Sequence, residues 1–340
     1  MHVLVPPFIQ AKFEQHQDVG CFSASTLFVD LVGFTLITES VMQYGQHGAE
    51  VLALFMRSVF TPLMQCVADQ GGFVAMMAGD AFTAVFSGEL PDDQTLATAV
   101  QRAVTAAVKI QDGLQAMPDR DTPYGIFTVA AKIGIAAGEV KWTIWRSEDG
   151  RRAAYSFSGA AIDGCATAEH HASQGEIILV PIAYQLLPAV ATAEPLADHW
   201  CLTASPLSPP FSALHPPEPA RPSLKTPFFP SDLITQSRTG EFRPIFSLFL
   251  GLPGGLEMQA LAAFIHCLFA LQEQYGGLLN RVDFGDKGCH LLLFWGAPVS
   301  HENDLARVLT FLLELRRQSP LAFRAGLTYG IAHAGFTGSP

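Results

Sequence analysis

The sequence predicts an α+β fold, an α/β sandwich, in which one structural unit occurs twice. In residues 21–180, short apolar runs that are typical of strands alternate with longer helical patterns. A Gly79-Asp80 turn between two apolar runs indicates a β-hairpin. After a stretch rich in proline and serine, the same order of segments returns, which indicates a tandem duplication. The 340 residues are enough for two ordinary domains, and 49% hydrophobic residues are enough to fill their cores.

The elements of the first unit follow from its residue pattern. Residues 26–29 form an apolar strand, and residues 47–72 have helical periodicity. Asp92 stands at the start of an alanine-rich segment, and we expect a helix from there to about residue 117 because acidic residues favour the first turn. The remaining expected elements are two strands in 127–145 that meet at Gly138, a helix over 160–173 and a buried strand over 176–180.

A change of composition separates the two units. Residues 196–242 are dense in proline and serine, which disfavours regular helices and central strands. We interpret them as a linker that is docked on the protein, because Phe228 and Phe229 would need cover. The expected division is an N-terminal segment (1–20), a first domain (21–195), the linker (196–242) and a second domain (243–340). The second copy lacks a counterpart of residues 154–180, so we expect it to stop before its last helix and strand.

The composition also narrows the class of protein. A net charge of −11 repels phosphate backbones, so nucleic acid is not an expected partner. The six cysteines are scattered without a CxxC pair, which is typical of a reducing compartment. Pro6 and Pro7 interrupt the N-terminal apolar run, so no signal peptide is expected. Residues 245–270 are interpreted as a strand, a turn and a buried helix. The sequence therefore predicts a cytoplasmic protein without a membrane segment.

Two aspartates are the main candidates for a functional site. Asp30 ends the apolar run at 27–29, and Asp80 lies in the Gly-Asp turn. An aspartate at a strand end often only caps a turn or the next helix, and an aspartate in such a turn is often only a hairpin residue. Two carboxylates held on rigid elements can instead bind divalent metal ions. Because both lie in a duplicated pattern, the metal site is the interpretation that we favour.

Other polar groups have plainer interpretations. Cys165 with His170 and His171 could hold zinc, but no second spaced pair accompanies them, so we expect a solvated helix face. A charged group in the second hairpin is expected to form a solvated tip, and its members are Asp283, Asp286 and Lys287.

The pattern as a whole resembles the class III nucleotidyl cyclases. It consists of a strand that ends in Asp, then "GFT", a helix, "GG", a "GD" hairpin and the strand "KIGIAAGEV". The resemblance covers nearly the whole chain outside the linker and is greatest to the tandem domains of the soluble adenylyl cyclase branch. It implies two tandem cyclase domains with ferredoxin-like βαββαβ cores, of which the second is incomplete, and an active site between them.

The resemblance implies a reaction and a metal site. The implied reaction converts ATP to 3',5'-cyclic AMP and pyrophosphate, at the interface of a pseudo-heterodimer formed within the chain. Asp30 and Asp80 are the implied catalytic ligands of two Mg²⁺ or Mn²⁺ ions, and the backbone carbonyl of Leu31 is a further ligand. A regulatory region is expected downstream.

Further residues are implied to bind the nucleotide. The amides of Gly33, Phe34 and Thr35 would point at the triphosphate from the start of a helix. Lys132 aligns with a residue that binds the terminal phosphates, although an edge-strand lysine could also only solvate its strand. Arg281 lies where an adenine-reading lysine is found in the family, and the alternative is a surface residue.

The chain departs from the family pattern at two pairs of positions. Asp163 and Thr167 replace the transition-state asparagine and arginine in the first copy, and the second copy does not reach that place before Pro340. The pair that holds bicarbonate in mammalian relatives is replaced by Met76 and Ala166, so no activation by bicarbonate is expected through it. A catalytically inactive nucleotide-sensing module of a longer multidomain protein, and a guanylate cyclase, therefore remain alternatives.

Overall fold

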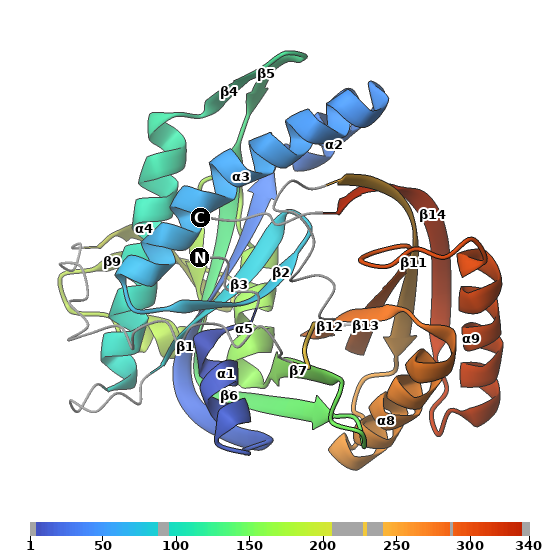
Figure 1. Ribbon diagram of the computed structural model, residues 1–340. Helices are drawn as coiled ribbons and strands as arrows, with labels where there is room; N and C mark the ends of the chain where they lie inside the picture. Colours follow the sequence, from blue (N-terminus) through green and yellow to red (C-terminus); the bar gives the residue numbers. More distant parts are fainter. Residues whose placement is uncertain (1–4, 88–94, 206–226, 230–240, 286–287, 335–340) are drawn as a thin grey trace.

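Two β-sheets, each with helices against it, lie side by side in the chain (Figure 1). The structure is a computed structural model that describes residues 5–87, 95–205, 227–229, 241–285 and 288–334. The first sheet comes from the first copy of the duplicated pattern and the second sheet from the second copy. The predicted α+β fold class is confirmed.

The first unit is built around a sheet with strand order β2-β3-β1-β6-β8-β10-β9, in which β7 also pairs with β6. The pair β6–β8 is parallel and the other pairs are antiparallel. Its elements in chain order are α1 (Pro7–Glu14), β1 (Val19–Val32), α2 (Phe34–Met42), α3 (Gly45–Asp69), β2 (Phe73–Ala78), β3 (Ala81–Ser87), α4 (Leu96–Ala116), β4 (Asp119–Thr122), β5 (Gly125–Thr128), β6 (Ala130–Arg146), β7 (Ala153–Ser158), α5 (Ala160–His170), β8 (Ile177–Leu179), α6 (Pro181–Gln185), β9 (Thr192–Leu196) and β10 (His199–Ala204).

The second unit repeats the central part of the first. Its sheet has the order β12-β13-β11-β14, which corresponds to β2-β3-β1-β6. Its elements are β11 (Glu241–Leu252), α8 (Met258–Tyr275), β12 (Leu278–Gly285), β13 (Gly288–Trp295), α9 (Asp304–Gln318) and β14 (Arg324–Ala334). The strand, turn and buried helix predicted for 245–270 are confirmed by β11 and α8.

Helices cover both faces of the first sheet. On one face, apolar residues of α3 and α4 such as Phe55 and Ile110 pack against Leu27 of β1 in the largest core. On the other face, α5 lies close to β1 and β6. The hydroxyl of Thr26 donates a hydrogen bond of 2.7 Å to the carbonyl of Ala161 at the start of α5. This packing holds α5 against the face of the sheet that carries the candidate site.

Some of the expected strands differ from the observed ones. Residues 127–145 were expected to form two strands that meet at Gly138, but β6 is one strand that pairs continuously with β1 through Gly138. A Cβ at Gly138 would lie 3.9 Å from the amide nitrogen of Ala161, so this glycine marks the approach of α5 rather than a turn. The strands β4, β5 and β7 were not anticipated.

The linker range also begins later than expected. Residues 199–204 form β10, which pairs with both β8 and β9. The strand is held because the Trp200 ring stacks on Tyr184 of α6 with ring centroids 3.8 Å apart. Much of the expected linker lies outside the described residues. Its described part is docked as predicted, since Phe228 is 6% exposed and the carbonyl of Pro227 accepts a hydrogen bond of 2.9 Å from the Ala153 amide.

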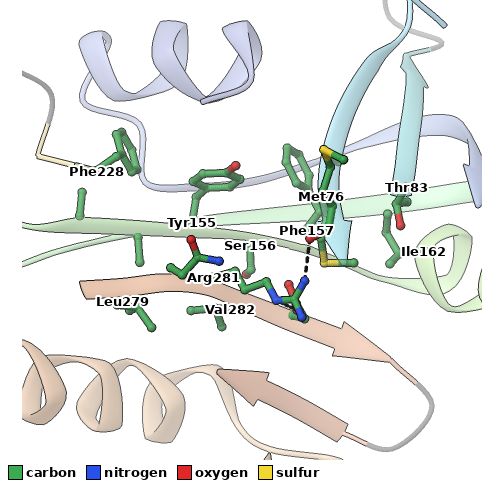
Figure 2. A pocket seen from close by; sticks show the side chains of 16 residues that line it. Met76, Thr83, Tyr155, Ser156, Phe157, Ile162, Phe228, Leu279, Arg281 and Val282 are labelled. Atoms are coloured by element: carbon green, nitrogen blue, oxygen red, sulfur yellow. Dashed lines mark hydrogen bonds and ion pairs between the residues drawn. The ribbon is translucent and has the colours of Figure 1, made fainter. Parts of the chain in front are cut away.

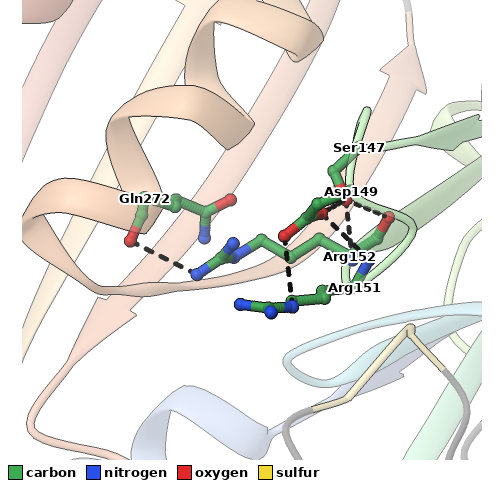
Figure 3. Close-up of polar contacts among 5 residues, drawn as sticks. All are labelled: Ser147, Asp149, Arg151, Arg152 and Gln272. Carbon is green, nitrogen blue, oxygen red and sulfur yellow. Dashed lines mark hydrogen bonds and ion pairs between the residues drawn. The ribbon is translucent and has the colours of Figure 1, made fainter.

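The two units share apolar and polar contacts. Trp145, at the end of β6, is buried within the core of the second unit together with Ala154 of β7. In the turn between these two strands, the hydroxyl of Ser147 donates to Asp149, which orders the turn (Figure 3). The guanidinium of Arg152 donates across the junction to the carbonyl of Gln272 in α8 at 3.5 Å (Figure 3). The packing of the units against each other is therefore anchored at this turn.

One helix among the described residues, α3, is long and apolar enough to cross a membrane, judged by length and composition only. Such a helix is weak evidence for a membrane span, because the core helix of a globular domain meets the same criteria. In α3 the side chains of Phe55, Val59 and Leu63 pack into the core of the first unit.

Candidate active site

Asp30 lies on β1 between the two neighbouring strands of the first sheet. It pairs with Ala81 of β3 on one side and with Lys132 of β6 on the other. Side chains that pair directly across antiparallel strands point to the same face, so the carboxylate of Asp30 and the amine of Lys132 share one face of the sheet. Asp30 itself is half-buried.

The β2–β3 hairpin brings Asp80 to the same place. Its turn uses Gly79 at a φ of 66°, and the amide of Leu31 donates a hydrogen bond of 3.1 Å to the carbonyl of Asp80. The predicted hairpin is therefore confirmed. Burial, followed by the charges of Asp80 and Glu169, raises the pKa of Asp30 to about 6. The two predicted carboxylates are thus close enough to oppose each other's ionisation, which is the arrangement that a cation would relieve.

Lys132 has an acidic neighbour that the sequence analysis missed. Its ammonium nitrogen lies 3.8 Å from Oε1 of Glu169, a buried residue near the end of α5. Burial raises the pKa of Glu169, and the charge of Lys132 opposes that rise. The sequence gives one signal for Glu169. It lies four and eight residues after Cys165 and Ala161, which places it on the buried face of α5.

The predicted phosphate-binding residues Gly33, Phe34 and Thr35 lie at the start of α2. Gly33 precedes the helix with a φ of 95°, and a Cβ at this position would lie 2.8 Å from the carbonyl oxygen of Thr128. Only glycine fits there without strain. In the part of the chain that the structure describes, no side chain caps the helix at this end, so the amides around Phe34 and Thr35 could donate to an anion. Thr35 is exposed and Phe34 is partly buried against the core.

Arg281 reaches the same region from the second unit. Its Nη1 donates a hydrogen bond of 2.6 Å to the carbonyl of Met77, which lies on β2 just before the Gly79-Asp80 turn. Figure 2 shows this contact between β12 and β2. Arg281 of the second unit therefore contacts the strand that leads into the hairpin turn of Asp80.

Asp283 is not the solvated tip residue that the sequence predicted. Its carboxylate lies 2.8 Å from Nε of Arg281, and its side chain is 16% exposed. Burial raises its pKa to about 6, against the lowering effect of Arg281. The reason is that β12 packs on β7 of the first unit, which covers a position that would be open in an isolated hairpin. The expected tip residues Asp286 and Lys287 lie outside the described residues.

A cavity of about 130 Å³ adjoins Arg281 between the two units (Figure 2). Its walls come from β2 and β7 of the first unit, from β12 of the second and from Phe228. Met76 and Met77 are among the lining residues. The side of the cavity formed by Met76 and Met77 is apolar, so the residues present there do not provide a charge for an anion.

The carboxylate oxygens at this site are suited to divalent metal ions that are also bound by the phosphates of a substrate. Among the described residues, no group of three or more His, Cys, Asp and Glu side chains is placed to hold a metal alone. Of the residues weighed for zinc in the sequence, His170 and His171 are exposed as expected for a solvated helix face, whereas Cys165 is fully buried. Asp30 and Asp80 provide two hard oxygen ligands, and Mg²⁺ in nucleotide sites is commonly bound by one or two carboxylates together with substrate phosphates.

The chain is similar in sequence to mammalian proteins named adenylate cyclase type 10. It is 28% identical to adenylate cyclase type 10 of Rattus norvegicus over 199 residues, which are 58% of this chain and 12% of that protein. It is 23% identical to adenylate cyclase type 10 of Homo sapiens over 325 residues, which are 82% of this chain and 19% of that protein. The chain therefore spans less than a fifth of the length of these relatives. No protein-family model matches the chain.

A solved structure shares the fold over nearly the whole chain. The crystal structure of a class III adenylyl cyclase-like ATP-binding protein from Pseudomonas aeruginosa aligns with a TM-score of 0.58 and 13% identity. The alignment covers 92% of this chain and 76% of that one. At this level of identity the likeness concerns the fold, and it extends over both units.

Proposed function

Because the chain is homologous to the class III nucleotidyl cyclases and has their fold, we propose that it is the cyclase region of an adenylate cyclase. In this proposal it converts ATP to 3',5'-cyclic AMP and pyrophosphate in cyclic-nucleotide signalling. One observation carries the proposal. Asp30 and Asp80 meet at the start of α2, and Arg281 of the other unit contacts the same hairpin.

The first unit has the role of binding metal ions and phosphates. Asp30, Asp80 and the carbonyl of Leu31 would hold two Mg²⁺ or Mn²⁺ ions, which would supply activation of the ribose 3'-hydroxyl and neutralisation of phosphate charge. The first-turn amides of α2 orient the triphosphate. Lys132 binds the terminal phosphates, and its contact with Glu169 keeps the ammonium group on the correct face of the sheet when no anion is present.

The second unit has the role of reading the base. Arg281 donates a hydrogen bond to a ring nitrogen of adenine, and Asp283 holds its guanidinium in place. Adenine N1 accepts a hydrogen bond, whereas guanine N1 carries a hydrogen and donates one, so a donor residue such as Arg281 favours ATP over GTP. The two units act as a pseudo-heterodimer within one chain, and a regulatory region follows downstream.

A nucleotide-sensing module is the second candidate function. It is favoured by Asp163 and Thr167 on α5, which stand in place of the family's transition-state asparagine and arginine. Without an arginine to stabilise charge on the phosphate, we expect a rate lower by roughly 10²-fold or more. The fold neighbour described as a cyclase-like ATP-binding protein gives a precedent for nucleotide binding on this fold.

The experiment that separates the two is an assay of cyclic AMP and cyclic GMP formation with Mg²⁺ and with Mn²⁺. Asp30→Ala and Asp80→Ala are the test variants, and Asp112→Ala, at an exposed site on α4, is the matched control. Cyclic AMP that disappears in both test variants and persists in the control supports the cyclase. Binding of ATP by a folded protein that forms neither product supports the sensing module and contradicts catalysis.

A further inference from the structure

The outer side of α9 carries a row of exposed leucines. Leu305, Leu309 and Leu313 stand four residues apart, so they lie above one another along the helix. They are 51%, 43% and 68% exposed, in that order. On the inner side of α9, Val308 and Phe311 are fully buried in the core of the second unit. The helix is therefore apolar on two sides, and the core of its own unit uses only one of them.

A second apolar side is unusual for a helix at the surface. Such a helix normally has polar residues on the side opposite its core face. Single exposed leucines are ordinary, but a contiguous row marks a surface that another molecule can cover. The row from Leu305 to Leu313 spans about 12 Å along the helix axis. Its outer two side chains point about 40° to either side of Leu309, so all three face the same way.

The row lies away from the candidate active site. In Figure 1, α9 is at the side of the second unit that faces away from the first unit. It packs on α8 and on β11, which belong to its own unit. A molecule that covered the leucines would therefore leave the junction between the two units open.

The two ends of the row carry opposite charges. Glu302 is exposed in the turn that leads into α9, and Arg316 is exposed in the last turn of the helix. Neither of them belongs to the ion pairs that the structure describes at this helix. Both lie seven residues from Leu309, one on each side of it. The pattern is thus symmetric about Leu309 in its spacing and opposite in its charge.

We propose that α9 joins two copies of this chain as an antiparallel helix pair, with a twofold axis at Leu309. The twofold rotation reverses the helix, so Leu309 meets its own copy and Leu305 faces Leu313 of the partner subunit. The same rotation sets Glu302 against Arg316 of the partner subunit, twice in each dimer. A parallel pair would instead set like charges against each other. Because both copies use the same patch, the contact closes at two subunits.

The size of the contact predicts a weak dimer. A helix of 15 residues is about 22 Å long, and one such pair covers roughly half of the area that a standard interface buries on each partner. Each copy also has a net charge of −11, and this charge opposes association. We therefore expect a dissociation constant on the order of 10–100 μM. The proposal uses no residue of the candidate active site, so it is independent of the function proposed above.

Sedimentation velocity of the full chain, over concentrations on both sides of this value, measures the association. Leu309→Glu sets two carboxylates against each other at the axis and should weaken the dimer by at least about tenfold. The variant should fold, because its side chain replaces one that is 43% exposed. Leu54→Glu is the matched control, since Leu54 is a leucine of α3 that is 68% exposed. It should leave the dissociation constant within about twofold, and circular dichroism checks that both variants are folded.

A charge exchange tests the antiparallel arrangement. Glu302→Arg and Arg316→Glu should each weaken the dimer several-fold, because each turns two attractive pairs into repulsive ones. The double variant restores opposite charges and should recover the affinity of the wild type. A dimer that Leu309→Glu leaves intact, or that the double variant does not restore, would overturn the proposal. A chain that stays monomeric at every concentration would also overturn it and would leave the leucines to a different occupant.

Discussion

The ammonium nitrogen of Lys132 lies 3.8 Å from Oε1 of Glu169, and the carboxylate is the more buried partner of the two. The pair links β6 to α5 beside Asp30. Lys132 lies among three carboxylates, because the charges of Asp80 and Glu169 both raise the pKa of Asp30 while the charge of Lys132 lowers it. This excess of negative charge is a property that a bound cation would compensate.

The affinity for a nucleotide should respond to both partners of this pair. We expect Lys132→Met to weaken binding of ATP with Mg²⁺ by about tenfold, because one phosphate contact is lost. Glu169→Gln should strengthen it by a few fold, since it removes a negative charge that competes with the phosphate for Lys132. Calorimetric titration gives both values, and Lys132→Arg serves as a charge-preserving control. Unchanged affinity in Lys132→Met would rule out a phosphate-binding role.

The stability of the metal-free protein should depend on pH through Asp30. Its pKa is raised from 3.8 to about 6 in the folded protein. Between these pH values the folded chain binds a proton that the unfolded chain has lost, so the free energy of unfolding decreases as the pH rises through this window. Asp30→Asn cannot ionise and should be more stable than the wild type at pH 7.5, by about 1 kcal/mol after allowance for solvent screening.

Thermal unfolding in EDTA at pH 3.5 and pH 7.5 measures this difference. The advantage of Asp30→Asn should vanish at the lower pH, where both states of the wild type are protonated. Asp112→Asn, at an exposed position, should show no advantage at either pH. A wild type that is more stable than Asp30→Asn at pH 7.5 without metal would show that the carboxylate is not destabilised.

Gly134 should be far less tolerant of substitution than its counterpart in the second unit. A Cβ at Gly134 would lie 2.1 Å from the carbonyl oxygen of Cys165 in α5, whereas at Gly326 nothing among the described residues lies within 4 Å. We expect Gly134→Ala to cost about 2–3 kcal/mol of unfolding free energy. Gly326→Ala should change it by less than about 0.5 kcal/mol. Urea unfolding checks both, and equal effects would mean that α5 can move away from β6.

Arg281 should control nucleotide binding through its hydrogen-bond donors. Arg281→Ala should weaken ATP binding by about tenfold, which corresponds to the loss of one charged hydrogen bond. Arg281→Lys should recover part of the affinity, because an ammonium group can also donate to a ring nitrogen. Competition titrations with ATP and GTP make the comparison. An Arg281→Ala variant with wild-type affinity for ATP would assign this residue to the interface alone.

The features that the sequence predicts well are those set by local chemistry. The Gly79-Asp80 hairpin follows from turn residues between apolar runs, and α8 follows from a helical pattern after a glycine-rich turn. The features that it misses depend on contacts between distant segments. Asp283 is buried by β7 of the other unit, and Gly138 accommodates the start of α5. No local pattern records either contact.

The sequence likewise predicts only those residues of the candidate site that follow a local pattern. The position of Asp30 at the end of an apolar run could be recognised from the sequence, and so could the glycine that starts α2. The charge of Glu169 beside Lys132 could not, because it depends on how α5 lies across β6.

The burial of Trp145 of the first unit in the core of the second restricts how the two halves of the chain can diverge. A second unit separated from its partner would carry an indole-sized hole, and a first unit alone would expose a large aromatic ring to water. Exchange of one half with that of a distant relative would require a matching change in the other half. We therefore expect that neither unit can be exchanged alone without a loss of stability.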